Sequence, residues 1–394
     1  MISETIKTQV ITALNRYKYQ FFPKIVTLAP HKQSRGDVLL SYITHPFNLK
    51  SDDLTFNIHT NQWECKQIAN TWIKHGYNVD IIDWENSTFL PKKDYSVFID
   101  IHFNMERIAP FLGKNCKKIL HITGAHWRFQ NDAENKRLLA LKERTGITLQ
   151  PKRQVPPSFG IEYADCATIL GNSVTQETFA YSGKLLYPIP LSTTVQYPLM
   201  EKKFEKIRKN FLWLGSSGMV HKGLDLVLEA FRDLPDYNLI ICGPVNRESD
   251  FKKTYFKELY QSPNIKTLGF IDVSSDQFLE VIKNTSALIY PSCSEGQAGS
   301  VITCLHAGLI PVISYESGVD IEDFGIILKK CSIGEIIDSI KGLSQKPEIE
   351  LQQMSEKAWQ YARTHHTKEK FAECYDKFVN KMISEKDRSH ETPL

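Results

Sequence analysis

The feature that most constrains the fold is a regular alternation of short, β-rich apolar runs with amphipathic helical stretches, which occurs twice along the chain. The first series has expected strands at 37–43, 77–82, 96–101, 117–123 and 167–171. The second series has them at 210–215, 237–243, 264–270, 286–292 and 310–314. Strands that alternate with helices in this way are typical of parallel sheets with crossover helices. The alternation therefore predicts an α/β protein with two Rossmann-like, doubly wound domains.

The alternation is interrupted once, where several prolines precede the charged run EKKFEKIRK at 201–209. Prolines and dense charge favour a linker over a buried element. After the second series, apolar residues recur at a helical period, so the chain is expected to end in helices. We predict four segments: an N-terminal domain at 1–190, a linker at 191–209, a C-terminal domain at 210–364, and a helix with a polar tail at 365–394 that packs back toward the N-terminal domain.

Composition excludes several classes of function. The 48 basic and 45 acidic residues leave a formal charge of only +3, which disfavours nucleic acid as a partner. Eight cysteines are scattered without metal-ligand spacing, as expected for a reducing compartment and no structural zinc. No run of roughly 18 apolar residues is present, so we expect a cytoplasmic protein without a membrane span.

The N-terminus has a short apolar stripe formed by Ile6, Val10, Ile11, Leu14 and Tyr17. Basic residues beside the stripe are also found in helices that lie on a membrane surface. A helix packed on the core explains the same stripe and is the favoured interpretation. Peripheral membrane contact stays open as the alternative.

The first segment with chemical potential is FLWLGSSGMVHKGLDLVLEAF at 211–231. A strand ends in a turn from Gly215 to Gly218, and a helix begins just after Lys222. Glycines let the backbone approach a ligand, a helix N-terminus attracts anions, and lysine adds a point charge. The turn thus predicts a phosphate site, although a purely structural turn explains it equally well.

The second segment is YPSCSEGQAGSVITCLHAGLIPVIS at 290–314. A strand is followed by a glycine-containing loop with Glu295 in it, and a helix begins near Gly299. Loops at the carboxyl ends of parallel strands face the crevice where α/β proteins bind ligands. Glu295 is therefore a candidate acceptor for sugar hydroxyls, and an exposed loop glutamate is the alternative.

The order and spacing of these two segments, with ICGP (241–244) and TLGFID (267–272) between them, resemble the group 1 (family 4-like) glycosyltransferase domain of GT-B enzymes. The resemblance covers most of the C-terminal half. It implies two Rossmann-like domains that face each other across a cleft. The nucleotide-sugar donor would bind the C-terminal domain, and the acceptor would approach from the N-terminal one.

Carried over residue by residue, the resemblance implies that Lys222 contacts the donor diphosphate and Glu295 the donor sugar, both as catalytic residues. The other implied donor-binding residues lie in the two segments and at the strand ends between them: Gly215, Ser216, Ser217, Gly243, Gly269, Phe270, Ile271, Gly296, Gln297, Ala298, Gly299, Ser300 and Thr303.

Two of these positions depart from the family pattern. Ser216 stands where the family places a phosphate-binding arginine, and Thr303 stands in place of the second glutamate of the E-x7-E motif. Arg247 and Lys266 are candidates to replace the missing charge. The departures keep open an atypical or inactive member of the family.

The N-terminal half resembles the family more weakly, through HGYNVDII (75–82) and ADCATILGNSVTQETF (164–179). His126, after the strand at 117–123, is the candidate catalytic histidine, and His121 is a poorer one. A histidine that only holds a loop is the alternative. Candidates on the acceptor or sugar side are Asn61, Gln62, Trp63, His102 and Asn104. Loops 44–60 and 124–160 have no readable motif.

The function implied by the resemblance is transfer of a sugar, such as a hexosyl group, from a nucleoside diphosphate sugar to a glycan, lipid-linked or small-molecule acceptor. Retention of anomeric configuration is expected, with no cofactor and no metal. The alternatives are a non-catalytic sugar-nucleotide-binding protein, a GT-B sugar-nucleotide epimerase, and a glycogen-phosphorylase-like enzyme, for which no pyridoxal lysine site is evident.

Overall fold

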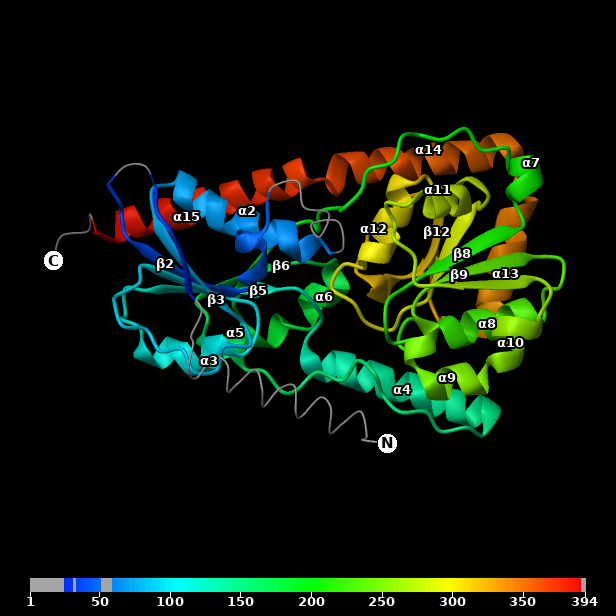
Figure 1. Cartoon of the computed structure of the whole chain (residues 1–394), viewed down its shortest axis with the longest axis horizontal. Coiled ribbons are helices and arrows are strands. Elements are labelled where there is room, and N and C mark those ends of the chain that lie inside the picture. The colour runs from blue at the N-terminus through cyan, green and yellow to red at the C-terminus, as the bar shows by residue number, and fades with distance from the viewer. Residues whose placement is uncertain (1–24, 31–32, 51–58, 391–394) are drawn as a thin grey trace.

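The computed structural model describes residues 25–30, 33–50 and 59–390, and the apolar stripe at 6–17 lies outside them. The chain forms two α/β lobes side by side (Figure 1). The N-terminal sheet contains β1 (Ile25–Leu28), β2 (Asp37–Tyr42), β3 (Asn78–Asp83), β4 (Val97–Asp100), β5 (Lys117–Ile122), β6 (Cys166–Ile169) and β7 (Leu185–Pro188). The C-terminal sheet contains β8 (Asn210–Leu214), β9 (Asn238–Cys242), β10 (Ile265–Gly269), β11 (Ala287–Tyr290), β12 (Ile310–Ser314) and β13 (Ile326–Leu328).

Helices connect the strands and cover both sheets. The N-terminal lobe contributes η1 (His45–Asn48), α2 (Thr60–Lys74), α3 (Asn104–Ile108), η3 (Ala109–Phe111), α4 (Trp127–Thr145), α5 (Gly160–Tyr163), α6 (Ser173–Glu177) and η4 (Ala180–Ser182). The remainder are α7 (Phe204–Ile207), α8 (Leu224–Arg232), η5 (Val245–Arg247), α9 (Ser249–Thr254), α10 (Phe256–Gln261), α11 (Asp276–Lys283), α12 (Gly299–His306), η6 (Tyr315–Ser317), α13 (Ile333–Gln345), α14 (Glu348–His365) and α15 (Lys368–His390). No helix among the described residues is long and apolar enough to cross a bilayer.

The strand order of both sheets confirms the doubly wound fold. The C-terminal sheet is parallel in the order β10-β9-β8-β11-β12-β13. The N-terminal sheet has the order β1-β3-β2-β4-β5-β6-β7, in which only β1 runs antiparallel, against β3. In each sheet the order reverses once, between β8 and β11 and between β2 and β4. Such a switch point opens a crevice at the carboxyl ends of the strands, where α/β proteins bind their ligands.

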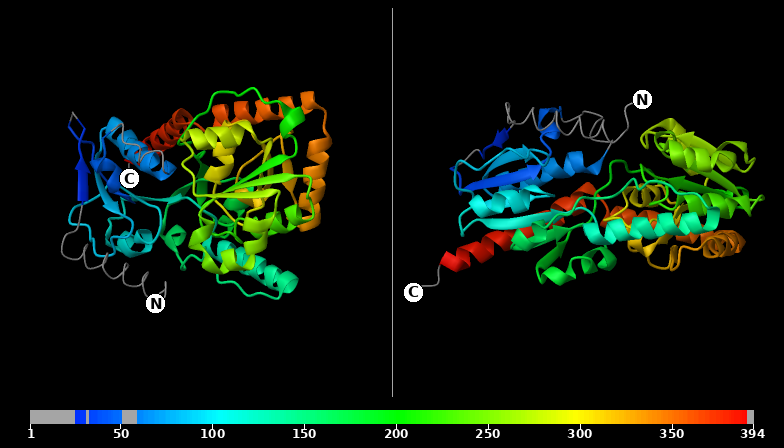
Figure 2. Two further views of the ribbon diagram at one scale, coloured as in Figure 1. Left: turned by 45° about the vertical axis from the view of Figure 1, so that its right-hand side comes forward. Right: turned by 90° about the horizontal axis from the view of Figure 1, so that it is seen from below.

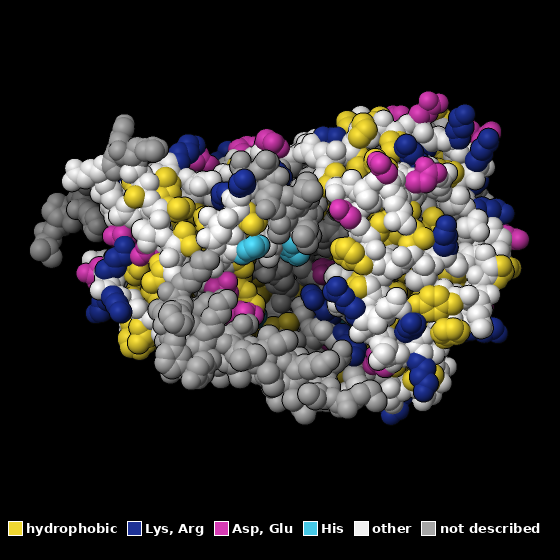
Figure 3. Space-filling model, in the orientation of Figure 1, with side chains coloured by type: hydrophobic (Ala, Val, Ile, Leu, Met, Phe, Trp, Pro, Cys, Tyr) yellow, Lys and Arg dark blue, Asp and Glu magenta, His cyan; other side chains and the backbone are white. Residues whose placement is uncertain are grey.

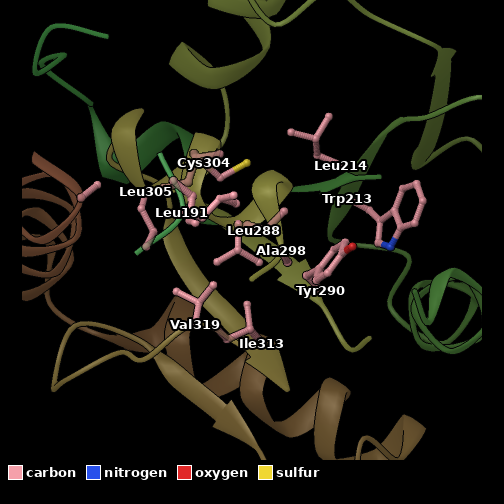
Figure 4. Packing of buried hydrophobic residues seen from close by; sticks show 14 of the residues in the cluster. Leu191, Trp213, Leu214, Leu288, Tyr290, Ala298, Cys304, Leu305, Ile313 and Val319 are labelled. Atoms are coloured by element: carbon pink, nitrogen blue, oxygen red, sulfur yellow. The ribbon is translucent and has the colours of Figure 1, made fainter. Parts of the chain in front are cut away.

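The strands are apolar on both faces because helices cover both. In β2, Val38 and Leu40 join the larger core cluster, whereas Leu39 joins a second cluster on the opposite face. The side chains labelled in Figure 4 show the C-terminal part of the larger cluster, where Leu191 of the linker points toward Cys304 and Leu305 of α12. The linker is therefore packed on the C-terminal lobe.

Three strands were missed by the sequence analysis because they are short edge strands with weak patterning. These are β1 and β7, at the two edges of the N-terminal sheet, and β13 at the edge of the other. An edge strand is covered less than a central one, so the apolar run that marks a buried strand is absent.

The segment 124–160 is not a loop, which corrects the sequence analysis. Most of it is the 19-residue helix α4, which runs from the N-terminal lobe along the underside of the other lobe (Figures 1 and 2). Arg144 near its end pairs with Asp225 at 2.7 Å and with Glu229 at 3.1 Å, both on α8. Helices α14 and α15 also link the lobes, because α14 packs on α12 and α15 packs on α2.

Candidate functional site

The two segments singled out in the sequence meet at the switch point of the C-terminal sheet. Strand β8 leads into the turn at 215–223, and its neighbour β11 leads into the loop at 291–298, before α12 begins at Gly299. Because both strands are parallel, their following loops lie at the same edge of the sheet. The space-filling view shows basic side chains and histidines gathered where the two lobes meet (Figure 3). Residues far apart in the sequence are therefore brought together at this edge.

Lys222 and Glu295 form an ion pair at the centre of this edge. Their Nζ and Oε1 atoms are 2.5 Å apart, and the two side chains are only 5% and 12% exposed. Lys222 also donates to the Tyr290 hydroxyl at 2.9 Å. Glu295 Oε1 accepts two more hydrogen bonds, from Tyr290 at 2.9 Å and from Ser292 at 3.1 Å. The pair is thus fixed by residues at the end of β11.

The charges around the pair keep Glu295 ionised. Burial raises the pKa of Glu295, but Lys222, with smaller contributions from His221 and Arg153, brings it down to about 2. Burial lowers the pKa of His221, and its Nε2 donates to the Ser294 carbonyl at 2.5 Å. The site therefore holds one carboxylate and one ammonium beside an imidazole.

The pair retains hydrogen-bonding capacity for a ligand. Among the described residues, nothing donates to Glu295 Oε2, and Lys222 uses two of its three ammonium protons. One acceptor and one donor thus stay available side by side, a combination that suits a sugar hydroxyl next to a phosphate oxygen.

The packing of the turn also requires glycine. A Cβ at Gly215 would lie 2.5 Å from the Trp213 ring, so the indole excludes any larger residue there. The amides of Gly218 and Met219 donate to the carboxylate of Glu248 at 2.5 and 3.1 Å. Two of the amides of this turn are therefore already bound to an anionic group of the protein.

Two residues that depart from the family pattern lie on this edge. Ser216 is exposed and Ser217 is half-buried, while Thr303 is buried in the first turns of α12. The proposed substitutes Arg247 and Lys266 are both exposed, and no described residue ties either of them to the turn. The structure thus offers no support for charge replacement by these two residues.

The loop after β11 is pressed against the N-terminal lobe. A Cβ at Gly296 would lie 2.4 Å from the Thr123 carbonyl oxygen, so only glycine fits this contact. The Gln297 side chain accepts a hydrogen bond from the Leu191 amide at 2.6 Å, and the Ala298 amide donates within its own lobe. The two lobes are therefore in direct contact beside the ion pair.

The ends of β8, β9 and β10 form one rim of the site. Gly243 donates to the Gly269 carbonyl at 2.7 Å, and a Cβ at Gly243 would lie 2.7 Å from the Gly215 carbonyl. Phe270 beyond them is 71% exposed, whereas Ile271 is in the core. Phe270 rather than Ile271 thus offers an aromatic face at the predicted nucleobase position.

Both candidate histidines are tied to the protein. His126 is the N-cap of α4, where Nδ1 accepts from the Arg128 amide at 3.3 Å and Nε2 lies 3.2 Å from the Tyr181 hydroxyl. His121 is buried within β5 and bonded through Nδ1 to Thr168 at 2.7 Å. The arrangement agrees with the alternative in which His126 holds a loop.

The acceptor-side candidates divide into two groups. Asn61 and Gln62 open α2, and their buried side-chain oxygens have no partner among the described residues. Trp63 packs on α15 through Phe371. Asn104 is bonded to β2 and to the carbonyl after β3, while His102 stacks between Trp84 and Phe103. The side-chain oxygens of Asn61 and Gln62 are thus buried without a partner among the described residues, whereas the Asn104 side chain is hydrogen-bonded.

A family model matches part of the C-terminal half of the chain. Residues 201–361 match the model described as glycosyl transferases group 1. This region is therefore similar to group 1 glycosyl transferases. A search of curated proteins found no match to the sequence.

Two solved structures share the GT-B fold with most of this chain. Sucrose-phosphate synthase from Thermosynechococcus elongatus aligns over 90% of this chain and 100% of its own, with 13% identity and a TM-score of 0.61. Anabaena HepE, solved with UDP and glucose, aligns over 88% and 99%, with 10% identity and a TM-score of 0.54. S. aureus TarM aligns over 71% of this chain, which spans only 54% of TarM, with 13% identity and a TM-score of 0.47.

Several residues of the candidate site were not predicted from the sequence. Tyr290, Ser292 and His221 lie within the two motif segments. The available signal was that His221 is next to Lys222 in the sequence and that Tyr290 and Ser292 are close to Glu295. Arg153 comes from the segment after α4 and has no local motif. Among the described residues, no group of three or more His, Cys, Asp or Glu side chains is placed to hold a metal ion.

Proposed function

We propose that the chain is a glycosyltransferase that transfers a sugar, such as a hexosyl group, from a nucleoside diphosphate sugar to an acceptor hydroxyl. The proposal includes retention of anomeric configuration and no requirement for a metal. The observation that carries it is the buried Lys222–Glu295 pair at the switch point of a domain similar to group 1 glycosyl transferases.

The pair suits the two ends of the donor molecule. The free acceptor atom of Glu295 would bind a hydroxyl of the donor sugar, and its pKa of about 2 keeps it ionised at any physiological pH. The free ammonium proton of Lys222 would contact the diphosphate. Negative charge develops on the diphosphate as the glycosidic bond breaks, and a positive group already in place stabilises that charge without reorganisation.

The direct contact between the lobes supports transfer within an enclosed site. Gly296 touches Thr123, and Thr175 of α6 donates to the carbonyl of Gly296 at 3.3 Å. Exclusion of water strengthens electrostatic interactions with the leaving group and limits hydrolysis of the donor. We propose that the lobes separate to admit the donor and then return to this contact.

In the proposed reaction, His126 acts by its position beside the acceptor. Its ring nitrogens are engaged by the Arg128 amide and by Tyr181, which in turn donates to Glu162 at 2.9 Å. The same residues line a pocket of about 320 Å³ with Phe129 and Phe159. Aromatic faces beside hydrogen-bonding groups suit a sugar or other amphipathic acceptor, so we place the acceptor at this pocket.

The test is release of nucleoside diphosphate from a panel of nucleotide sugars in the presence of mixed acceptors. We expect Glu295→Gln and Lys222→Ala each to lower turnover at least about tenfold, equivalent to roughly 1.4 kcal/mol. The exposed pair of Lys357 and Asp323, 2.5 Å apart, supplies a matched control. Lys357→Ala and Asp323→Asn should leave turnover unchanged, and equal rates in all four variants would place the site elsewhere.

A non-catalytic sugar-nucleotide-binding protein is the second candidate, favoured by the Ser216 and Thr303 departures. Thermal shift separates the two, because a ligand that binds only the native state stabilises it increasingly as the ligand concentration rises above Kd. Stabilisation by a nucleotide sugar without release of the nucleoside diphosphate for any acceptor would establish the binding function instead.

A further inference from the structure

Arg153 lies across the turn that carries Lys222, although it comes from the N-terminal half of the chain. A Cβ placed on Gly218 would be 2.5 Å from Arg153 Cγ and 3.0 Å from its Cδ. The Gly218 carbonyl in turn accepts the Lys222 amide at 2.8 Å. The aliphatic stem of the arginine thus runs over the backbone of the turn.

The segment around Arg153 is held in place by a buried glutamate of α4. Glu134 is 2% exposed and accepts hydrogen bonds from the amides of Lys152 and Arg153, both at 2.9 Å. The Gln130 side chain donates to the Arg153 carbonyl at 2.6 Å. On the side of the C-terminal lobe, Lys152 lies 3.6 Å from Asp250. These contacts fix the backbone at Arg153 against both α4 and the turn.

Within the described part of the chain, the guanidinium group makes no hydrogen bond. Among the described residues, all hydrogen bonds of Arg153 are made by its backbone, and its buried Nε atom has no partner. An arginine that only stabilised the fold would be expected to satisfy its planar set of donors. The guanidinium group is therefore held beside the turn without a hydrogen-bond partner among the residues that the structure describes.

Its charge faces the cleft between the lobes. The pKa of Glu295, which burial raises and Lys222 lowers most, is lowered further by Arg153. Burial, with a smaller contribution from Arg153, lowers the pKa of His59, the N-cap of α2 in the other lobe. Since Glu295 offsets the charge of Lys222, Arg153 supplies positive charge that this pair does not neutralise.

We propose that Arg153 binds the diphosphate of the donor. The segment after α4 places this cation at the glycine turn. This inference rests on the proposed function and names one more residue of the same site. A guanidinium suits the role because its parallel N–H donors bind two phosphate oxygens at once. A donor diphosphate would then be held from both halves of the chain, by Lys222 and by Arg153.

The test compares nucleoside diphosphates with the corresponding monophosphates by isothermal titration of the full-length protein. Arg153→Met keeps an unbranched stem over Gly218 and removes the charge. We expect it to raise the Kd of the bound diphosphate about ten- to a hundredfold, and that of the monophosphate clearly less. Arg153→Lys should recover part of the affinity. Lys152→Ala removes a neighbouring charge that faces Asp250, and it should change the Kd less than about twofold.

The outcomes separate this inference from the proposed function. If wild-type protein binds a nucleoside diphosphate and Arg153→Met binds it equally well, the assignment of Arg153 is wrong and the function stands. An equal loss for diphosphate and monophosphate would also overturn the assignment, because it would indicate a structural effect. If the wild type binds no nucleoside diphosphate or nucleotide sugar at all, the proposed function fails first.

Discussion

Removing one partner of the Lys222–Glu295 pair should cost more stability than removing both. Lys222→Met leaves the Glu295 carboxylate almost buried without its ammonium, while Glu295→Gln leaves the ammonium without its carboxylate. The double variant has neither charge to desolvate. Breaking a buried pair is strongly destabilising, whereas replacing both members by neutral groups costs much less.

The magnitude follows from the pKa of Glu295. The pKa is lowered from 4.5 to about 2 in the folded protein. At 1.36 kcal/mol for each pKa unit, the surroundings stabilise the ionised carboxylate by roughly 3 kcal/mol. We expect Lys222→Met to lower the free energy of unfolding by about 3 kcal/mol. The double variant should cost less than either single variant, so its cost should fall short of their sum by more than about 3 kcal/mol.

The assay is urea denaturation at pH 7 of the wild type, the two single variants and the double variant, with a pH series for the wild type and Glu295→Gln. The unfolded state binds more protons than the folded state between pH 4.5 and 2, because the folded pKa is the lower one. The stabilisation is therefore complete above pH 4.5 and disappears as the pH falls through 2. Glu295→Gln should lose this part of the acid dependence.

The exposed pair of Lys357 and Asp323 serves as the control cycle, since its side chains are 51% and 70% exposed at a similar separation of 2.5 Å. Solvent screens such a pair, and its double-mutant coupling should be close to zero. Additive effects of Lys222→Met and Glu295→Gln, or coupling no larger than in the control cycle, would refute the argument.

Three other perturbations test the contacts between lobes and a buried acid. Arg144→Met should lower the free energy of unfolding by about 3 kcal/mol, because it leaves buried Asp225 without its partner. The same variant should speed hydrogen exchange in α4. Unchanged exchange would show that this ion pair does not hold α4 against the C-terminal lobe. Gly296→Ala should raise the radius of gyration in X-ray scattering, because its Cβ would lie 2.4 Å from the Thr123 carbonyl; an unaltered profile would contradict this. Burial raises the pKa of Glu64 to about 7. The free energy of unfolding of the wild type should therefore fall by roughly 3 kcal/mol from pH 4.5 to 7. In urea denaturation, Glu64→Gln should abolish this dependence of stability on pH.

The central strands of both sheets could be predicted from the sequence because they are buried on both faces. Runs such as those of β2, β4 and β11 are largely apolar along their length, as is typical of strands covered by helices on both sides. Short edge strands such as β1 lack this pattern. Helix α4 has no apolar stripe either, because its buried residues include Gln130 and Glu134.

The candidate site was predictable only in part. Lys222 and Glu295 follow predicted strands, and loops after parallel strands share one edge of the sheet, so both could be assigned to the crevice. Their direct pairing depends on β8 and β11 being neighbours, although β9 and β10 separate them in the chain. Local sequence does not encode strand order.

The position of Arg153 depends entirely on the three-dimensional arrangement. It reaches Gly218 because α4 leaves its own lobe and a buried glutamate anchors the segment that follows. Periodicity and motifs report how a residue meets its near neighbours along the chain. Contacts between distant segments arise from the packing of whole elements, and a polar helix docked by buried ion pairs leaves no periodic signal of where it will lie.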